Sequence, residues 1–241
     1  MGLKFGSLLL ALVAGCSGPA ARQSPGEGEP GAGIGLLTIQ GDRGIFGSFG
    51  RGTGVVIDGQ FMITVAHNLR DEELGRVTEV EAGGGVNGKG RAWTVSSAYL
   101  MRQSEGGRKK SDPLLLENDF GFIELEESVT GGPVFNLDRM MAVAVAKGAV
   151  VHVAGYAGGK ELLSSTGRVT GVRGSLFSYE AKTRKGMSGS PVWVERNGRR
   201  VLVGIHLGSD IGGFEGAVAR RVDRGLIGEY DRWVASRAGR E

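Results

Sequence analysis

Glycine is the residue that most constrains the fold of this chain, because it accounts for 45 of the 241 residues. Glycine destabilises helix interiors and is suited to turns that need a positive φ angle. A helical bundle is therefore not expected, and many short strands joined by tight turns are. Hydrophobic residues make up 40% of the chain, which allows a sizeable core in one or two domains.

Two pairs of apolar runs have the pattern of β-hairpins, because each pair flanks a dipeptide favoured in tight turns. The dipeptides are Asp58-Gly59 and Asn197-Gly198, and the flanking runs are 54–57, 61–65, 192–194 and 201–205. Further strands are expected at 36–39, 92–95, 120–125, 142–145, 150–154 and 167–170. A helix is expected only near the C-terminus, at 221–236. Closely spaced strands predict an all-β barrel or sandwich.

The chain also divides into regions of different composition. Residues 16–33 are rich in Gly, Pro, Ala and Glu, which predicts a flexible tether that buries little. The segment 127–138 contains Gly131-Gly132-Pro133 and separates the strands into two similar groups. We therefore expect two β-barrel halves, at 34–130 and 131–241, the second ending in the helix.

Charge and cysteine content exclude several functions. The net charge of +3 is a weak bias for this length, so no nucleic-acid partner is expected. Cys16 is the only cysteine, so no internal disulfide and no cysteine metal cluster can form. The three histidines lack the spacing of a zinc motif such as H-E-x-x-H. We expect neither a metal nor a cofactor.

Residues 1–15 have the features of an export signal. Lys4 precedes an apolar run that is too short to span a bilayer as a helix. The run ends in Val13-Ala14-Gly15-Cys16, which resembles the lipobox of bacterial lipoprotein signal peptides. The resemblance implies export and cleavage before Cys16. It also implies that lipid on Cys16 anchors the protein to a membrane of the bacterial cell envelope, and we expect the outer membrane. The alternative is an ordinary secretory signal with a chance cysteine.

Three segments carry side chains suited to nucleophilic catalysis. They are Thr64-Val65-Ala66-His67-Asn68, Glu117-Asn118-Asp119-Phe120-Gly121-Phe122-Ile123 and Gly186-Met187-Ser188-Gly189-Ser190-Pro191. A serine hydroxyl needs a base to attack at neutral pH, and histidine titrates in that range. A buried carboxylate fixes the imidazole tautomer. Taken singly, His67 could be a structural histidine, Asp119 a turn or cap residue, and Ser188 a loop residue.

Taken together, in the order His, Asp, Ser, the segments resemble the motifs of chymotrypsin-like serine proteases. The order differs from those of α/β-hydrolases and subtilisins. The resemblance implies two six-stranded antiparallel β-barrels with a C-terminal helix, and one site at their junction. It also implies a serine endopeptidase that acts on a polypeptide substrate, with His67, Asp119 and Ser188 as the triad. The backbone amides of Gly186 and Ser188 would then form the oxyanion hole.

Other segments are similar to the glutamyl endopeptidase, or V8-protease-like, branch of that family. They are Ser188-Gly189-Ser190-Pro191-Val192, Gly204-Ile205-His206, Val153-Ala154-Gly155-Tyr156 and Gly216-Ala217-Val218. The resemblance implies that Thr183 and His206 line the pocket for the substrate residue before the cleaved bond. A hydroxyl and an imidazole can bind a carboxylate, which predicts cleavage after Glu. Alternatively, His206 is a hydrogen-bonded strand residue and Thr183 an ordinary loop residue.

Two features depart from the resemblance. In the V8-like group the free N-terminal amine helps to bind the acidic side chain of the substrate. If Cys16 is lipidated, this amine is not available to the pocket. Met187 stands where mammalian relatives carry an aspartate that pairs with a new N-terminus, so the oxyanion loop must be organised by local packing. The rival function is a catalytically silent envelope lipoprotein that uses the scaffold as a binding module, because fold does not dictate function.

Overall fold

The computed structural model describes residues 31–43, 48–71, 75–104, 112–129, 135–137 and 145–238. The predicted signal peptide, Cys16 and most of the predicted tether lie outside these residues, as do 142–144 of one predicted strand. The last residues of the predicted tether, 31–33, form a buried turn in which the Gly31 carbonyl accepts from the Ile34 amide. No helix in the described ranges is both long and apolar enough to cross a membrane.

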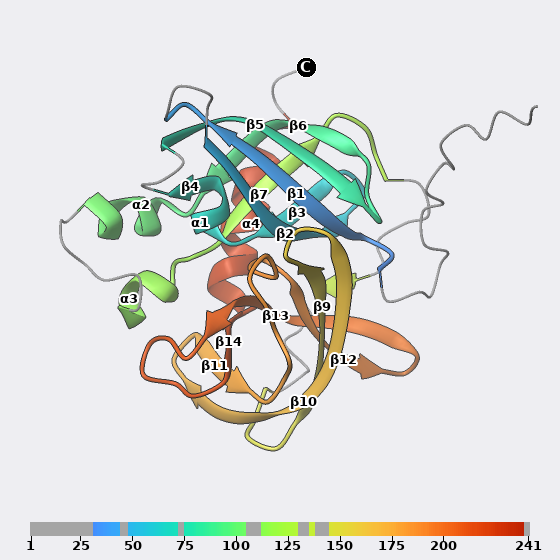
Figure 1. Cartoon of the computed structure of the whole chain (residues 1–241), viewed down its shortest axis with the longest axis vertical. Coiled ribbons are helices and arrows are strands. Elements are labelled where there is room, and N and C mark those ends of the chain that lie inside the picture. The colour runs from blue at the N-terminus through green and yellow to red at the C-terminus, as the bar shows by residue number, and fades with distance from the viewer. Residues whose placement is uncertain are drawn as a thin grey trace, which may run out of the picture.

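The first half of the chain forms a closed antiparallel barrel (Figure 1). Its strands are β1 (Ile34–Gly41), β2 (Ser48–Asp58), β3 (Phe61–Thr64), β7 (Gly121–Leu125), β6 (Gly88–Val95) and β5 (Gly75–Gly84), in that spatial order. Pairing of β1 with β5 closes the barrel. The short strand β4 (Arg70–Asp71) pairs with the start of β5. Gly35 of β1 and Gly54 of β2 make room for the Met62 side chain inside the barrel, because a Cβ atom at either would lie 2.9 or 3.0 Å from its methyl carbon.

The second half forms a similar barrel from six strands. They are β12 (Pro191–Arg196), β9 (Val150–Ala157), β10 (Glu161–Arg173), β11 (Leu176–Tyr179), β14 (Ala217–Arg221) and β13 (Arg199–Ser209), in that spatial order. Pairing of β12 with β13 closes it, and β8 (Phe135–Leu137) adds a parallel strand to β13. The prediction of an all-β fold with two six-stranded antiparallel barrels is confirmed. The predicted boundary at 130 and 131 lies outside the described residues.

Both predicted hairpins are present. The strands β12 and β13 are joined at Asn197-Gly198, as predicted, whereas the turn between β2 and β3 is Gly59-Gln60, one residue later than the predicted pair, because Asp58 still pairs with Phe61. Asn197 and Gly198 have φ angles of 52° and 71°. Two successive positive φ values are the geometry of a type I′ turn, which explains the Asn-Gly pair.

The expectation that helix occurs only near the C-terminus is wrong. The predicted helix is present as α4 (Arg224–Ala235), but the chain also forms α1 (Ala66–Leu69), α2 (Ser97–Ser104) and α3 (Pro113–Leu116). All three escape detection by hydrophobic periodicity, because α1 and α3 are single turns and α2 buries only Tyr99. The start of α3 does have a local signal, since the Asp112 side chain accepts from the Leu114 amide and Pro113 begins the helix.

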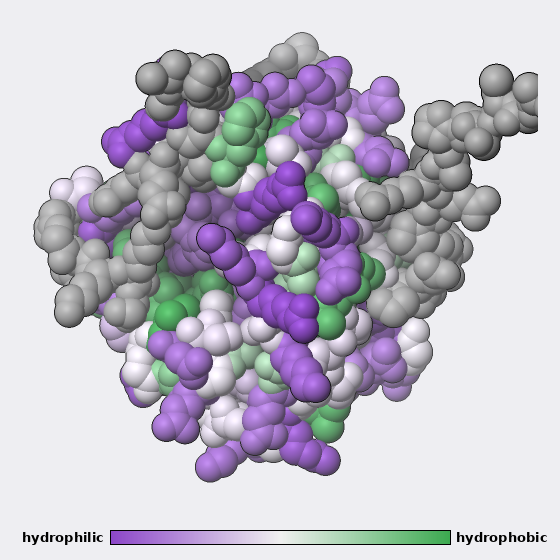
Figure 2. Space-filling view, viewed as in Figure 1, coloured by the Kyte–Doolittle hydropathy of each residue, from purple (hydrophilic) through white to green (hydrophobic). Residues whose placement is uncertain are grey.

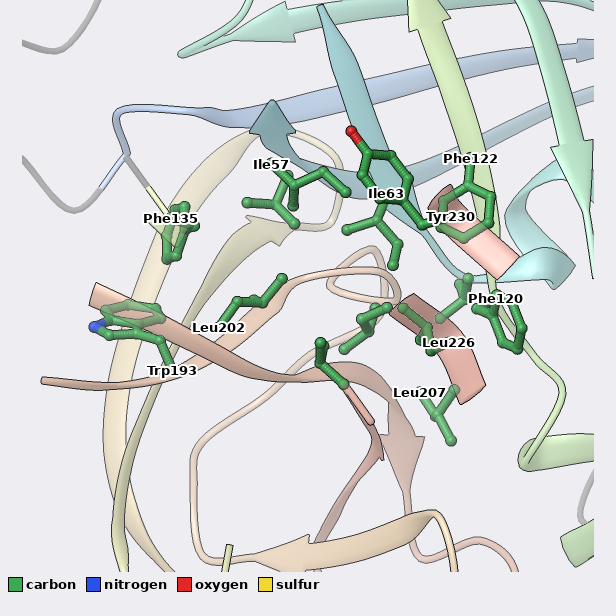
Figure 3. Packing of buried hydrophobic residues seen from close by; sticks show 14 of the residues in the cluster. Ile57, Ile63, Phe120, Phe122, Phe135, Trp193, Leu202, Leu207, Leu226 and Tyr230 are labelled. Atoms are coloured by element: carbon green, nitrogen blue, oxygen red, sulfur yellow. The ribbon is translucent and has the colours of Figure 1, made fainter. Parts of the chain in front are cut away.

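The two barrels and α4 share one hydrophobic core, shown in Figure 3. Ile57, Ile63 and Phe120 of the first barrel belong to the same buried cluster as Leu202 and Leu207 of the second. The C-terminal helix contributes Tyr230 and Trp233, whose rings lie 5.4 and 5.5 Å from the ring of Phe122. This shared core holds the two barrels in a fixed orientation, so residues from both halves can form one site.

Candidate active site

His67 and Asp119 are brought together by the pairing of two strands in the first barrel. His67 lies on α1 directly after β3, and Asp119 lies in the loop directly before β7. Because β3 and β7 are antiparallel, with Thr64 opposite Gly121, the end of one strand lies beside the start of the other. The sequence positions of His67 and Asp119 therefore fix their proximity.

The Asp119 carboxylate holds the His67 residue at two points. The backbone amide of His67 donates to Oδ1 at 2.9 Å, and Nδ1 lies 2.6 Å from Oδ2. Asp119 is only 3% exposed, so its carboxylate is enclosed under the imidazole. An ionised carboxylate only accepts, so Nδ1 carries the proton and Nε2 of the neutral ring is the basic nitrogen.

Ser188 enters the same site from the second barrel. It lies in the tight loop between β11 and β12, and its hydroxyl donates to the Leu207 carbonyl at 3.3 Å. Ser188 and His67 line one cavity of about 460 Å³. The structure thus places the three residues predicted as a triad at the junction of the barrels.

The two amides predicted for the oxyanion hole are oriented by hydrogen bonds of the peptide carbonyls that precede them. The Lys185 carbonyl accepts from the Gly158 amide at 2.7 Å, and the Met187 carbonyl accepts from the Ser190 amide at 2.9 Å. In a trans peptide the N–H points opposite to the C=O, so the amides of Gly186 and Ser188 are turned away from these partners. Neither amide donates to any carbonyl in the described segments.

Gly186 has a backbone conformation that its neighbours make specific to glycine. Its φ is +97°, and a Cβ atom there would lie 2.6 Å from the Tyr156 carbonyl oxygen. Both the angle and the close approach exclude a side chain. Gly186 and Ser188 line the cavity that also contains His67, which is the position an oxyanion hole needs.

The first barrel holds the serine loop through a set of neutral hydrogen bonds, which we call the Thr53–Asn68 clamp. The Ser188 carbonyl accepts from the Thr53 amide and from the Asn68 side chain, both at 2.9 Å. The Thr53 hydroxyl donates to the Gly186 carbonyl and accepts from the Tyr156 amide, each at 3.0 Å. Thr53 is fully buried, so these bonds are shielded from water.

The oxyanion loop is also held by packing within the second barrel, as expected from Met187. Met187 is fully buried in the core of the second barrel, and its sulfur accepts from the Arg184 amide at 3.4 Å. Sequence reasoning missed Thr53 and the role of Asn68. Asn68 directly follows the motif histidine, but only its contact with Ser188, 120 residues away, gives it a role.

The second barrel in turn holds the aspartate loop, through a charged pair that we call the Arg220–Asp223 clamp. Arg220 of β14 is 5% exposed and donates through Nε to the Glu117 carbonyl, two residues before Asp119. Its guanidinium donates to the Asp223 carboxylate at 2.6 and 3.2 Å and lies 5.6 Å from the ring of Phe120. Sequence reasoning missed this pair as well.

Asp223 also caps α4, because its carboxylate accepts from the Leu226 amide at 3.0 Å. Burial alone would raise the pKa of Asp223, but hydrogen bonds and charge attraction from Arg220, together with the Leu226 amide, outweigh it. The pKa of Asp223 therefore lies below its ordinary value, and the carboxylate is ionised at neutral pH.

The two residues predicted to bind an acidic substrate side chain differ in burial and in hydrogen-bond partners. The Thr183 hydroxyl lies 2.8 Å from the Ser209 hydroxyl, a partner that sequence reasoning missed. His206 is 2% exposed, and its Nδ1 lies 2.9 Å from the Tyr179 hydroxyl. In the described part of the chain, no hydrogen bond joins Thr183 to His206.

The environment of His206 keeps its imidazole neutral. Burial is the main cause that lowers its pKa to about 4, and the nearby charge of His67 adds to the effect. A hydrogen bond with the Val218 backbone acts in the opposite direction and is weaker. Burial also raises the pKa of Tyr179, so the Tyr179–His206 pair is uncharged near neutral pH.

Comparison with known proteins agrees with this geometry. The family model for the trypsin-like peptidase domain matches residues 52–205. The glutamyl endopeptidase of Staphylococcus aureus strain MW2 is 38% identical over 71 residues, which are 28% of this chain. That match spans about a fifth of the relative, 21% of its length. The glutamyl endopeptidase of strain MSSA476 matches at the same identity over 20% of its length.

Solved structures share the fold. A Glu endopeptidase structure aligns with a TM-score of 0.63 and 18% identity, covering 86% of this chain and 92% of that one. The protease Anisep from Arthrobacter nicotinovorans aligns with a TM-score of 0.61 and 13% identity, covering 84% and 95%. At these identities the likeness is one of fold. Because the family model spans more than half of the sequence, this chain belongs to the trypsin-like peptidase family.

Proposed function

We propose that this protein is a serine endopeptidase that hydrolyses peptide bonds through an acyl-enzyme at Ser188. The observation that carries the proposal is the double hydrogen bond between Asp119 and His67, in a cavity that His67 shares with Ser188. A buried carboxylate is costly unless it is paired, and the described partners of the Asp119 carboxylate are the amide and the imidazole of His67. Family membership supports the same reaction class.

The chemistry follows from the roles that the geometry allows. Nε2 of His67 takes the Ser188 hydroxyl proton while Oγ attacks the substrate carbonyl, and Asp119 stabilises the resulting imidazolium. The amides of Gly186 and Ser188 stabilise the oxyanion of the tetrahedral intermediate. His67 then gives its proton to the departing amine, and a water molecule repeats the sequence to release the acid. In the structure the Ser188 hydroxyl donates to the Leu207 carbonyl, and the proposal requires it to turn to Nε2 of His67 when substrate binds.

The test is a cleavage-site profile on a mixed peptide library with the purified protein and a Ser188→Ala variant. The proposal expects cleavage by the wild type and a loss of about 10⁶-fold in kcat for the variant, which leaves only the oxyanion hole and binding. Circular dichroism checks that the variant is folded. Absence of cleavage by folded wild-type protein would instead favour a silent binding module.

The proposal includes a preference for Glu before the cleaved bond. It is supported by the Thr183 and Ser209 hydroxyls, which can donate to a carboxylate, and by His206 behind them. With a pKa of about 4, His206 is neutral in the free protein, so the Thr183 and Ser209 hydroxyls would make the contacts with the substrate carboxylate.

Paired substrates with Glu or Gln at that position test this preference. We expect a Glu/Gln ratio in kcat/KM above one that falls by about tenfold in Thr183→Val, because one hydrogen bond to a charged group is removed. The Thr166→Val variant, which changes a threonine of β10 bonded to His152, is the matched control. A ratio that Thr183→Val leaves unchanged contradicts the pocket assignment.

We also propose that the enzyme acts at the bacterial cell envelope, anchored by lipid on Cys16. The support is the sequence motif at residues 13–16. Mass spectrometry of the mature N-terminus tests it: a diacylglyceryl-modified Cys16 is expected, and cleavage elsewhere with an unmodified thiol contradicts it. Cys16→Ala should abolish the modification and shift the protein from the membrane fraction.

A further inference from the structure

The cavity at Ser188 has a wall that the proposed reaction does not use. Besides His67, Ser188 and the oxyanion loop, it is lined by the start of β2, at Phe49 to Arg51, and by Gly158 and Lys185. Thr183 and His206 do not line it, so it is distinct from the predicted pocket for the residue before the cleaved bond. Figure 2 shows that hydrophilic residues gather across the middle of this face, where the two barrels meet.

The position of His67 shows which part of a substrate would face this wall. In the proposed function, on which this inference rests, His67 gives a proton to the departing amine. The departing peptide must therefore lie on the side of Ser188 that His67 faces. Since His67 lines the cavity, the cavity receives the residues that follow the cleaved bond.

Two cations are held at this wall by one glycine turn. The Gly158 amide donates to the Lys185 carbonyl at 2.7 Å, which fixes the backbone that carries the lysine. Arg51 donates from Nη1 to the Gly159 carbonyl at 3.4 Å, and its side chain lies so close over Gly159 that a Cβ atom there would be 2.3 Å from Cδ. The turn therefore places the Arg51 side chain and the backbone of Lys185 beside the same cavity, which both residues line.

Among the residues that the structure describes, these cations have no counter-ion. No carboxylate lines the cavity, and Arg51 and Lys185 form no ion pair within the described ranges. Arg184, on the same loop as Lys185, differs because it pairs with Glu161 at 3.8 Å. The Asp119 carboxylate is enclosed beneath His67 and does not offset the charge at the wall. The cavity is thus electrostatically complementary to an anion.

Phe49 adds an apolar surface to this positive wall. Its side chain is 65% exposed, which makes it one of the few large apolar side chains that the described surface presents to water. An aromatic ring beside two cations suits a ligand with a short apolar stem and an anionic end.

We propose that this cavity selects an acidic side chain within the first two residues of the departing peptide. The carboxylate lies between Arg51 and Lys185, and the methylene groups contact Phe49. The substrate class is therefore a polypeptide with acidic residues directly after the cleaved bond, in addition to any preference before it.

The test uses the purified full-length protein and two fluorogenic peptides that differ only in having Glu or Gln at the two positions after the cleaved bond. We expect kcat/KM for the Glu peptide to be about tenfold higher, as two partly exposed ion pairs would give. The ratio should fall as NaCl is raised, because exposed charges are screened. In the variant Arg51→Gln/Lys185→Gln it should approach one.

Lys182→Gln is the matched control, because Lys182 is an exposed lysine of the same loop that does not line the cavity. It should keep the wild-type ratio. A wild-type ratio near one, or a ratio that the double variant leaves unchanged, overturns this inference while the proposed function stands. If the folded wild-type protein cleaves neither peptide nor the mixed library, the proposed function itself fails, and with it this use of the cavity.

Discussion

The loops that carry Asp119 and Ser188 are each held by the opposite barrel, but by different chemistry. The aspartate loop of the first barrel is held by Arg220 of the second, through a charged pair with Asp223. The serine loop of the second barrel is held by Thr53 and Asn68 of the first, through neutral hydrogen bonds. The site is therefore a product of the junction, and neither barrel carries it alone.

The difference between the clamps has a physical basis. The aspartate loop has to hold a single carboxylate under the imidazole, and one strong guanidinium contact near its base is sufficient for this. The serine loop has to orient two backbone amides, which requires several bonds to specific carbonyls. The four predictions below test this division from the largest expected effect to the smallest.

The first prediction concerns the carboxylate that the charged clamp positions. Asp119→Asn should lower kcat about 10⁴-fold, because an amide can stabilise the wrong imidazole tautomer. The free energy of unfolding should change far less. Steady-state kinetics on a cleaved peptide and urea denaturation measure the two effects. A loss below tenfold would mean that Asp119 only supports the fold.

The second prediction breaks the charged clamp. Arg220→Met should lower the free energy of unfolding by about 3 kcal/mol, because the Asp223 carboxylate, whose side chain is 22% exposed, loses its only positively charged partner among the described residues. Urea denaturation measures this. The neighbouring Arg221→Met, which loses one exposed bond to Gly174, should cost much less. The double variant Arg220→Met/Asp223→Asn should recover part of the loss, since Asn still caps α4. Equal losses in the two single variants would refute the clamp.

The third prediction concerns acid, which should loosen the serine loop through His206. The backbone of His206 pairs with this loop, because its carbonyl accepts from Gly189 and its amide donates to Ser190, both at 2.8 Å. Its pKa is about 4 in the folded protein against an ordinary 6.5, so the unfolded chain binds the proton more readily. Stability should therefore fall by up to about 3 kcal/mol as pH drops from 6.5 to 4.

Urea denaturation across this pH range measures the third prediction. His206→Gln should flatten the slope, whereas His152→Gln, at a histidine bonded to Thr166 in β10, should keep it. The Arg220–Asp223 clamp contributes to the loss of stability in acid only at lower pH. The pKa of Asp223 is below the ordinary value of 3.8, so the carboxylate stays ionised in the folded protein until the pH falls below that value. A slope that survives in His206→Gln would assign the acid sensitivity elsewhere.

The fourth prediction breaks the neutral clamp. Thr53→Val should cost about 2 kcal/mol, because the buried Gly186 carbonyl and Tyr156 amide lose their partner. It should also lower kcat about tenfold with little change in KM, since the oxyanion amides lose their alignment. Thr78→Val, which removes an exposed bond to the Gln40 carbonyl, is the control. A change in KM alone would show that Thr53 acts on substrate binding instead.

The comparison of the clamps also explains what the sequence could predict. The barrels follow from local signals, such as the Asn197-Gly198 turn and the turn that begins at Gly59, each between apolar runs. The predicted triad lies in three short motifs, and the structure brings those residues together. The clamps are different, because Arg220 acts on a carbonyl 103 residues away and Thr53 on one 133 residues away.

Such contacts leave no local pattern. Arg220 lies near the end of a largely apolar strand, beside the half-buried Arg221 and shortly before the exposed Arg224, and nothing in this local sequence distinguishes it. Thr53 stands between two glycines of β2, and this local sequence does not indicate that its side chain contacts the second barrel. The helices α1 and α3 were missed for a related reason, since single turns have no periodicity to detect.

The most direct test of the central claim, that the two barrels assemble one activated serine, is fluorophosphonate labelling followed by peptide mapping. The account predicts a single covalent adduct on Ser188, formed far more slowly in Asp119→Asn and absent in Ser188→Ala. Folded wild-type protein that forms no adduct, or one that forms it on a different residue, would contradict the account.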